Sequence, residues 1–244
     1  MNEVAKESTD IYDQYQGTKG GRVVKNVIIT GANRGIGLEL VKIYAKEAKV
    51  FALCRQRSDE LDGLKGVTVI EDVDLRSQES INKAVQKCTG RIDLLISNAG
   101  VFHRDEGGIG NIDIESIQDH MTVNTLAPLT LIQTALNHLG SGSKVALISS
   151  RMGSITDNTS GGFYGYRMSK AALNALGKSL AVDLKPKNIT VAILHPGMVK
   201  TKITGYQGQY TPEEAAVGLA KRIEALTLEN TGSFVHAQGE ILPW

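Results

Sequence analysis

The sequence predicts a single-domain α/β fold in which a doubly wound parallel sheet of about seven strands carries helices on both faces. Two observations predict it. Short apolar runs rich in β-branched residues alternate along the chain with longer segments of helical periodicity, which is typical of parallel sheets. The apolar runs are also continuous, as expected for strands that are covered on both faces.

Seven apolar runs are expected to form strands, at 24–30, 50–54, 67–73, 92–97, 144–149, 190–194 and, with the weakest pattern, 233–236. Six segments with helical spacing are expected to form helices, at 35–46, 58–64, 77–87, 114–139, 166–184 and 212–228. Pro128 predicts a bend in the fifth, because proline lacks the N–H of a helical hydrogen bond. The sixth has a clear start, since Thr211 can cap it, Pro212 suits the first position and Glu214 can complete a capping box.

The length of 244 residues fits one domain over residues 24–244, which we expect to follow a flexible polar tail over residues 1–23. A net charge of +1 gives no reason to expect nucleic acid or a membrane surface as a partner. No apolar run approaches the roughly 20 residues that span a bilayer, and acidic residues in the tail argue against a targeting peptide. Two cysteines, Cys54 and Cys88, stand at no metal-binding spacing, so we expect a cytoplasmic protein without a metal site.

A glycine-rich turn follows the first expected strand and leads directly into helical periodicity. Its glycines are Gly31, Gly35 and Gly37. Glycine permits positive φ and a close approach of phosphate to the backbone, and a helix N-terminus offers free N–H groups to that phosphate. The spacing Gly-x-x-x-Gly-x-Gly differs from both the common dinucleotide fingerprint and the phosphate loop that ends in Gly-Lys-Ser/Thr.

Tyr166 and Lys170 stand one helical turn apart, so their side chains point to the same side. A lysine charge beside a phenol is expected to lower the phenol pKa from about 10, which suits proton exchange with a carbonyl or alcohol oxygen. Tyr164 is the other candidate, but Met168 rather than a cation lies four residues beyond it. Ser149 ends the fifth expected strand and Ser150 follows it, and alternation sends them to opposite faces.

These motifs, together with Asn98-Ala99-Gly100, Asn124 and Pro196-Gly197, occur in the order seen in short-chain dehydrogenases/reductases. The chain resembles that family over about residues 24–244. Residues 164–174 and the Pro243-Trp244 ending are most similar to its small carbonyl-reductase branch, which includes the sniffer and C-factor proteins. The resemblance implies a Rossmann-type fold that binds a nicotinamide dinucleotide beyond the carboxyl ends of the strands.

By this resemblance, the cofactor-binding residues are Gly31, Asn33, Arg34, Gly35, Ile36, Gly37, Arg55, Asp74, Leu75, Asn98, Ala99, Gly100, Tyr166, Lys170, Pro196, Gly197, Val199 and Thr201. Asp74 and Leu75 fall where the family contacts the adenine, with Asp72 as a nearby competitor. The Val199 amide and the Thr201 hydroxyl are expected to hold the carboxamide of the nicotinamide.

The cofactor is expected to be NADP(H) rather than NAD(H). An acidic residue at the end of the second strand would bind the ribose hydroxyls and repel a 2′-phosphate. This chain has Cys54-Arg55 there and no acidic residue before Asp59, and Arg34 adds a second cation from the glycine turn. Guanidinium groups suit phosphate oxygens, and both arginine positions match the NADP-preferring pattern of the family.

The resemblance implies four catalytic residues and a carbonyl reduction by hydride transfer from NADPH. Ser150, which two residues and a glycine follow as in the family, polarises the carbonyl of a small aldehyde or ketone. Tyr166 gives the proton as general acid, and Lys170 holds the nicotinamide ribose and keeps the phenol pKa low. Asn124 anchors a water that replaces, through Lys170, the proton that Tyr166 gives. The gap from Ser150 to Tyr166 exceeds the family spacing by three residues, which a loop over 156–162 can absorb.

Loops 101–111 and 201–210 are expected to close the substrate pocket. Candidate apolar liners are Met152, Ile155, Phe163, Tyr164, Met198 and Tyr206. His195 is interpreted as structural. Two alternatives remain open: an NADP(H)-binding sensor or signalling protein of the same fold, and an NAD-dependent alcohol dehydrogenase.

The two long helical segments carry more apolar residues than a sheet-covering face needs, namely Leu126, Leu129, Leu173, Leu176 and Leu180. In the family the matching helices pair across a two-fold axis. A homodimer or homotetramer is therefore expected.

Overall fold

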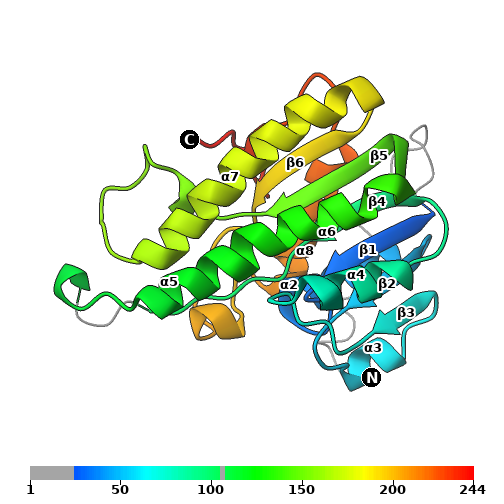
Figure 1. Cartoon of the computed structure of the whole chain (residues 1–244), viewed down its shortest axis with the longest axis horizontal. Coiled ribbons are helices and arrows are strands. Elements are labelled where there is room, and N and C mark those ends of the chain that lie inside the picture. Colours follow the sequence, from blue (N-terminus) through cyan, green and yellow to red (C-terminus); the bar gives the residue numbers. More distant parts are fainter. Residues whose placement is uncertain (1–24, 105–107) are drawn as a thin grey trace.

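Strands and helices alternate throughout the part of the chain that the structure describes. The computed structural model describes residues 25–104 and 108–244, so the expected flexible tail over 1–23 lies outside the described residues. The strands are β1 (Asn26–Thr30), β2 (Lys49–Leu53), β3 (Val67–Ile70), β4 (Ile92–Ser97), β5 (Leu139–Ile148), β6 (Thr190–His195) and β7 (Phe234–His236). They form one sheet in the order β3-β2-β1-β4-β5-β6-β7, and all neighbours run parallel (Figure 1). The predicted seven-stranded α/β fold is confirmed.

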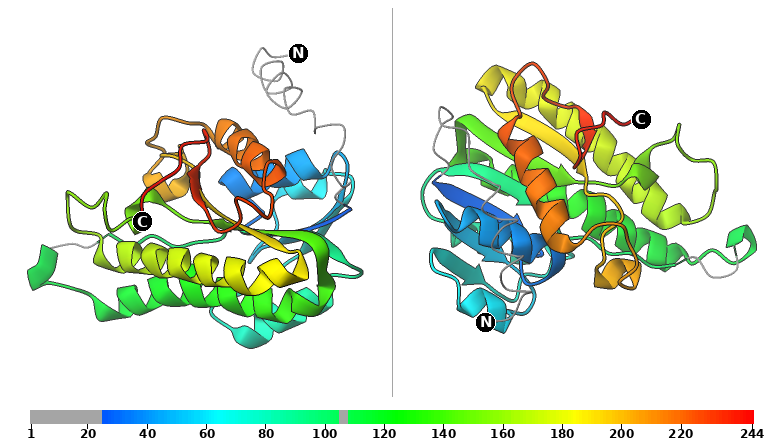
Figure 2. Two further views of the ribbon diagram at one scale, coloured as in Figure 1. Left: turned by 90° about the horizontal axis from the view of Figure 1, so that it is seen from above. Right: turned by 180° about the vertical axis from the view of Figure 1, so that it is seen from behind.

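Helices cover both faces of this sheet. The helices are α2 (Gly35–Tyr44), α3 (Asp59–Asp62), α4 (Gln78–Gln86), α5 (Ile114–Met121), α6 (Ala127–Ala135), α7 (Tyr164–Leu184) and α8 (Pro212–Glu224). Helices α2 and α8 pack together on one face, whereas α4 packs on α6, and α5 on α7, on the other (Figures 1 and 2). All six expected helical segments contain a helix, with bounds that differ by a few residues.

Two apolar layers hold the sheet between the helices. Val27 and Ile29 of β1 face the layer beneath α2 and α8, where they meet residues such as Leu40. Ile28 faces the opposite layer with Leu131 of α6. Neighbouring residues of a strand therefore enter different cores, which explains why the strands read as continuous apolar runs. Each fully buried side chain of this kind contributes about 1.5–3 kcal/mol to folding.

The expected single helix over 114–139 is divided in the structure. Helix α5 passes into a π-helical turn, η2 (Thr122–Leu126), then into α6 and a last 3₁₀ turn, η3 (Leu136–His138). Pro128 stands two residues after the π turn and cannot donate a helical hydrogen bond to the Asn124 carbonyl. The irregularity that proline predicts is thus a change of helical geometry around Asn124, and such π turns are frequent at functional sites.

Strand β5 begins five residues earlier than expected, at Leu139 instead of 144. Leu139 pairs with Ile92 of β4, after which the register shifts and Lys144 pairs with Leu94. The Gly-Ser-Gly-Ser stretch between the two pairings has no apolar pattern. Its polar residues sit in an irregularity of the strand pairing, which periodicity alone does not reveal.

The five leucines assigned to a surplus apolar surface divide into two groups. Leu173 is buried in the core, so for this residue the expectation is wrong, whereas Leu176 and Leu180 are half-buried and pack partly against the same core. Leu126 and Leu129 are exposed. The helix-period pattern could not separate them, because both groups lie on helices that already cover the sheet.

The strand order reverses between β1 and β4, and such a point leaves a crevice beyond the carboxyl ends of the strands.

The expected capping box of α8 is confirmed, with Thr211 accepting from the Glu214 amide at 3.2 Å and Glu214 accepting from the Thr211 amide at 2.8 Å. Within residues 25–104 and 108–244, the helices are too short or too polar to cross a bilayer.

Candidate active site

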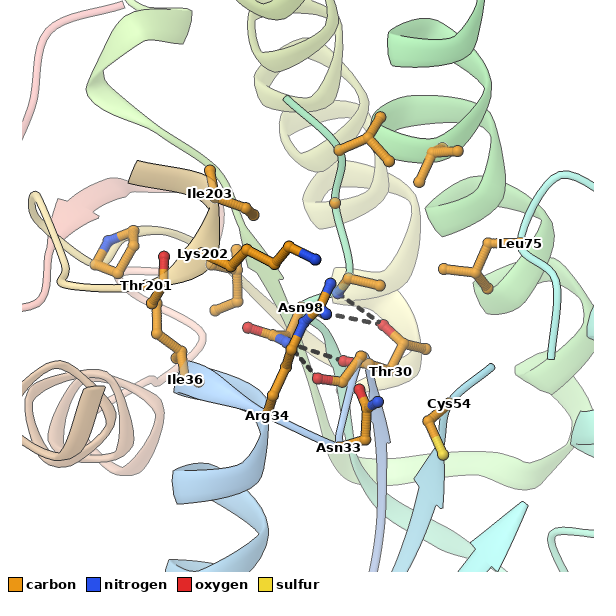
Figure 3. A pocket seen from close by; sticks show the side chains of 18 of the residues that line it. Thr30, Asn33, Arg34, Ile36, Cys54, Leu75, Asn98, Thr201, Lys202 and Ile203 are labelled. Atoms are coloured by element: carbon orange, nitrogen blue, oxygen red, sulfur yellow. Dashed lines mark hydrogen bonds between the residues drawn. The ribbon is translucent and has the colours of Figure 1, made fainter. Parts of the chain in front are cut away.

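A cavity of about 1040 Å³ opens at this crevice, where the loops after β1, β2, β4, β5 and β6 meet (Figure 3). Of the residues assigned to the site from the sequence, those that line it are Gly31, Asn33, Arg34, Gly35, Ile36, Arg55, Asp74, Leu75, Asn98, Ala99, Gly100, Ser150, Tyr166, Lys170, Pro196, Gly197, Val199 and Thr201. Gly37 and Asn124 are the two that do not. Residues far apart in the sequence are thereby brought to one sheet edge.

The glycine turn needs its glycines for two different reasons. Gly31 and Gly35 adopt φ of 64° and 54°, a region that side chains disfavour. A Cβ on Gly31 would also lie 2.9 Å from Ala99 Cα. Gly37 is buried, and a Cβ there would lie 2.1 Å from the Gly31 carbonyl oxygen. Gly37 therefore lets α2 pack against the turn, while Gly31 and Gly35 form the cavity wall.

The N-terminus of α2 faces this wall without a capping side chain from the described residues. Its N-cap residue is Arg34, which makes no side-chain cap, and the first turn holds no acidic residue. Gly35 and Ile36 of that turn line the cavity. The free N–H groups and the helix dipole therefore offer a site for an anionic group such as a phosphate.

Asn98 and Thr30 join the ends of β4 and β1. The Thr30 hydroxyl accepts from the amides of Asn98 and Ala99, both at 3.1 Å. The Asn98 side chain donates to the carbonyls of Thr30 at 3.0 Å and Gly31 at 3.3 Å (Figure 3). Asn98 is thus a cavity residue that also fixes the glycine turn, and Thr30, which was not assigned to the site, has the same structural role.

Two arginines border the cavity with no ion pair to another described residue. Arg34 and Arg55 are exposed and line it. The next arginine, Arg57, is bound at 2.8 Å to Glu71 and at 3.0 Å to Asp62, and it does not line the cavity. The sequence missed Lys202, which extends across the cavity from the loop after β6 (Figure 3). Asp72 and Asp74 both line the cavity, so both remain candidates for the adenine contact.

Lys170 is buried, and its ammonium donates to the Ile148 carbonyl at 2.9 Å. Burial lowers the pKa of Lys170 to about 8. Its Nζ lies 5.7 Å from the centre of the Tyr166 ring, so the two side chains adjoin as the helical spacing predicts. The residue is therefore a cation at neutral pH that can lose its proton in mild alkali.

Burial raises the pKa of Tyr166 to about 12, and a hydrogen bond with Ser150 lowers it only in part. The expectation that Lys170 holds this pKa low is wrong for the structure as it stands. Burial destabilises the phenolate of Tyr166 more than the charge of Lys170 stabilises it. Burial also destabilises the protonated form of Lys170 itself. Tyr166 is accordingly a protonated phenol throughout the neutral range.

Hydrogen bonding distinguishes the two candidate serines, and position distinguishes the two candidate tyrosines. The Ser149 hydroxyl donates at 2.5 Å to Asn174 in the core, whereas the Ser150 hydroxyl meets that of Tyr166. Tyr166 lines the cavity and Tyr164 does not. Ser149 also borders the cavity, but its hydroxyl is bound to Asn174, so Ser150 is the serine that meets Tyr166 there.

Asn124 is buried and acts as a clamp. Its Oδ1 accepts from the Val101 amide at 2.8 Å, and its Nδ2 donates to the Val101 carbonyl and the Ser169 hydroxyl, both at 3.0 Å. The side chain thus ties the loop after β4 to α7. These bonds use both hydrogens of the side-chain amide, so a water held by Asn124 would have to donate to one of its oxygen atoms. The water-anchoring role of Asn124 stays a prediction.

Aromatic side chains from the loops stand beside Tyr166. The Phe102 ring meets the Tyr166 ring edge-on at 4.9 Å and stacks on Phe163 at 5.7 Å. Of the six liners expected from the sequence, only Tyr206 borders the cavity. Phe102 was missed because a single aromatic residue in a loop carries no periodic signal.

His195 lines the cavity, so its interpretation as purely structural is incomplete. Burial is the first cause that lowers its pKa, to about 3, and its ring lies 5.0 Å from that of His236. It is a neutral imidazole at physiological pH. No group of three potential metal-binding side chains occurs in the two described segments.

The chain is similar in sequence to known proteins over most of its length. The family model of short chain dehydrogenases matches residues 25–211. The chain is 38% identical over 229 residues to 1-hydroxy-2-glutathionyl-2-methyl-3-butene dehydrogenase from Rhodococcus sp. strain AD45, a match that covers 91% of this chain and all of that protein. It is 39% identical over 166 residues to the C-signal protein of Myxococcus xanthus, covering 66% of this chain and 98% of that protein.

Two solved structures share the fold closely. The NADPH-bound carbonyl reductase from chicken fatty liver superimposes with a TM-score of 0.83 at 29% identity. The carbonyl reductase Sniffer of D. melanogaster also gives a TM-score of 0.83, at 30% identity. Both matches cover 91% of this chain and the whole of the other chain.

Proposed function

Because this chain belongs to the short-chain dehydrogenase/reductase family of oxidoreductases, we propose that it reduces the carbonyl group of a small aldehyde or ketone to the alcohol with NADPH. The observation that carries the proposal is the meeting of Ser150, Tyr166 and Lys170 with the glycine turn at one cavity. Two of the similar structures are named carbonyl reductases, and one of them holds NADPH.

The residues present fit a nicotinamide dinucleotide. Gly31 and Gly35 leave the backbone open to a close approach, and the uncapped N-terminus of α2 suits a diphosphate. Near the end of β2, Arg34 and Arg55 offer two guanidinium groups, and neither is neutralised by another described residue. This supports a 2′-phosphate on the ribose, and therefore NADP(H).

When bound, NADPH would supply the hydride that the carbonyl carbon accepts. The Ser150 hydroxyl donates a hydrogen bond to the carbonyl oxygen, and Tyr166 gives that oxygen its phenolic proton as the negative charge develops. Lys170, positioned by its bond to Ile148, presents a cation beside Tyr166 and can restore its proton. Hydride and proton together convert the carbonyl into an alcohol, and the phenolate is returned to a phenol.

The raised pKa of Tyr166 favours this direction. Reduction needs a phenol that can donate, and a pKa of about 12 keeps Tyr166 protonated at every physiological pH. Oxidation of an alcohol would need the phenolate, which burial disfavours. The structure without cofactor is therefore prepared for reduction.

A signalling role is the second candidate, because a relative at 39% identity is named C-signal. A sensor would bind NADPH and turn nothing over. The test is a panel of aldehydes and ketones mixed with NADPH or NADH, followed by loss of absorbance at the reduced nicotinamide band. Turnover with NADPH supports the reductase, binding without turnover supports the sensor, and faster alcohol oxidation with NAD would favour an NAD-dependent alcohol dehydrogenase.

A homodimer or homotetramer is part of the proposal. Leu126 and Leu129 are 52% and 39% exposed, and Met168 of the adjacent α7 is 52% exposed. Association of two copies through these helices would cover such side chains. Light scattering at micromolar concentration is expected to give at least twice the monomer mass of 26.2 kDa, and a monomer mass would contradict it.

A further inference from the structure

The carboxylate of Asp119 is shared by two side chains that come from different walls of the active-site region. Arg76 binds it through two bonds, from Nε to Oδ1 at 2.7 Å and from Nη2 to Oδ2 at 2.9 Å. The ring of His103 meets the same Oδ2 through Nε2 at 2.8 Å. Because two bonds from one guanidinium fix the plane of a carboxylate, Arg76 determines where Oδ2 is presented to His103.

The first arm of this arrangement begins at the cavity. Arg76 lines it together with Asp74 and Leu75, the pair assigned to the adenine. The Arg76 amide donates to the Asp74 carboxylate at 3.0 Å, so the three residues form one local unit. A dinucleotide that fills the cavity would restrict this unit and, with it, the guanidinium that holds Asp119.

The second arm ends beside the proton donor. The His103 amide donates to Nε2 of the buried His120 at 2.9 Å, which anchors the main chain at His103. The neighbouring Phe102 meets the Tyr166 ring at 4.9 Å and Phe163 at 5.7 Å. The position of His103 therefore influences the rings of Phe102 and Phe163 beside Tyr166, which together form an aromatic wall.

Exposure decides what this arrangement is for. The side chains of Arg76, Asp119 and His103 are 39%, 22% and 45% exposed. Ion pairs with this much solvent contact add little to the stability of a fold. The contacts do, however, link the loop of Arg76 to the loop of His103, 27 residues further along the chain. The three side chains therefore hold these loops in position rather than stabilise the fold.

We propose that Asp119 is a positioning residue that couples occupancy of the cofactor cavity to the order of loop 101–104 and its aromatic wall. The inference rests on the proposed function, because the occupant is NADPH. Binding fixes Arg76, Arg76 orients Asp119, and Asp119 holds His103. Substrate then meets a loop that the cofactor has already ordered, which gives positive cooperativity without a large conformational change.

The experiment measures hydrogen exchange at the His103 amide, which does not line the cavity, with and without saturating NADPH. In the wild type, NADPH should slow this exchange at least about 5-fold, the lower end of typical coupling between sites. In Arg76→Ala, which cuts the first arm, NADPH should slow it less than about 2-fold at saturation. Asp119→Asn, which keeps the shape but removes the charge, should give the same loss.

Arg57→Ala is the matched control. Arg57 is a similarly exposed arginine with two ion pairs in the same part of the fold, yet it does not border the cavity. It should keep the full protection at His103. A global loosening of the fold would appear as faster exchange in core strands and a lower melting temperature, neither of which we expect in Arg76→Ala.

The outcomes separate this inference from the function on which it rests. NADPH that binds and protects His103 equally in the wild type and in Arg76→Ala would overturn the coupling, because order would then pass along the chain from Gly100. NADPH that binds without any protection would overturn it too. Failure of the wild type to bind NADPH at all would overturn the proposed function and the coupling together.

Discussion

The cofactor half and the substrate half of the cleft are built in different ways. In the cofactor half, formed by the glycine turn and the ends of β1, β2 and β4, main-chain geometry makes the surface, and Asn98 bonds two carbonyls of the adjoining strand end. In the substrate half, formed by the loops after β4, β5 and β6, side chains make it. Ile203 and Tyr206 line the cavity from the loop after β6, they are 46% and 69% exposed, and neither lies in a strand.

The difference indicates which part of the cleft tolerates substitution. A surface made of backbone turns and glycines accepts one ligand shape, because adding a single carbon atom closes it. A surface made of exposed apolar side chains on loops can rearrange for different ligands. We therefore expect substitutions in the cofactor half to affect binding and stability sharply, and substitutions in the substrate loops to change preference.

The largest effect is expected where the two halves meet, at Tyr166. Tyr166→Phe keeps the ring that Phe102 contacts but removes the proton donor. Loss of general acid catalysis should lower kcat by about 100- to 10,000-fold. NADPH affinity, measured by fluorescence titration, should stay within about 2-fold, because the variant changes no group of the glycine turn. Substantial turnover in this variant would remove Tyr166 from the mechanism.

The contrast between the halves can be tested with two glycine substitutions. In Gly37→Ala the new Cβ would lie 2.1 Å from the Gly31 carbonyl oxygen, so α2 must move away from the turn. Overpacking of this kind should cost about 1–3 kcal/mol in the free energy of unfolding and weaken NADPH binding. Gly110→Ala, in the loop after β4, meets no atom within 4 Å and serves as the control. Equal effects in chemical denaturation and NADPH titration would erase the distinction.

The cofactor half was largely predictable from the sequence, because main-chain geometry makes its surface. Gly31 and Gly35 are required by backbone geometry, and a required residue leaves a pattern that can be recognised. Strand ends followed by Asn98 or Ser150 were also found, because parallel strands bring their carboxyl ends to one edge. Gly37 was placed in the right motif but not in its packing role.

The substrate half was less predictable, since its properties depend on tertiary contacts. Nothing local marks Phe102 as a neighbour of Tyr166, or Asp119 as a partner of both Arg76 and His103. The pKa of Tyr166 was predicted in the wrong direction because spacing shows the nearby charge but not the depth of burial. A short sequence motif can predict backbone geometry, but it does not predict the surroundings of a side chain.

A smaller effect is expected from the cations at the rim of the cofactor half. Removing Arg34 and Arg55 together should lower the ratio of kcat/KM for NADPH over NADH by about 10- to 100-fold, as expected for the loss of one or two charge-assisted hydrogen bonds. The control is again Arg57→Ala, since Arg57 is already paired with Glu71 and Asp62. If the double variant kept the wild-type ratio, the two arginines would be solvated charges without a role in cofactor choice.

The smallest effect, a change of about tenfold per pH unit, concerns Lys170, which lies where the cofactor half borders the catalytic residues. Its pKa of about 8 means that the ammonium is lost above pH 8, while Tyr166, with a pKa of about 12, keeps its proton. Because kcat/KM for NADPH reports groups of the free enzyme, it should be level from pH 6 to about 7, reach half its value near pH 8 and fall further above that pH. A profile that stays level to pH 10 would contradict this.

The same burial has an opposite and separable effect on stability. Between pH 8 and 9.5 an unfolded lysine, with a pKa near 10.4, keeps a proton that buried Lys170 has lost. The unfolded state then binds more protons, so the Lys170 contribution to the free energy of unfolding should rise with pH, by at most about 1.4 kcal/mol per unit. Urea titrations of the wild type and Lys170→Met would isolate it as their difference. Stability that rises while activity falls would assign both effects to one buried ammonium, whereas a difference independent of pH would mean that Lys170 stays charged and that the fall in activity has another source.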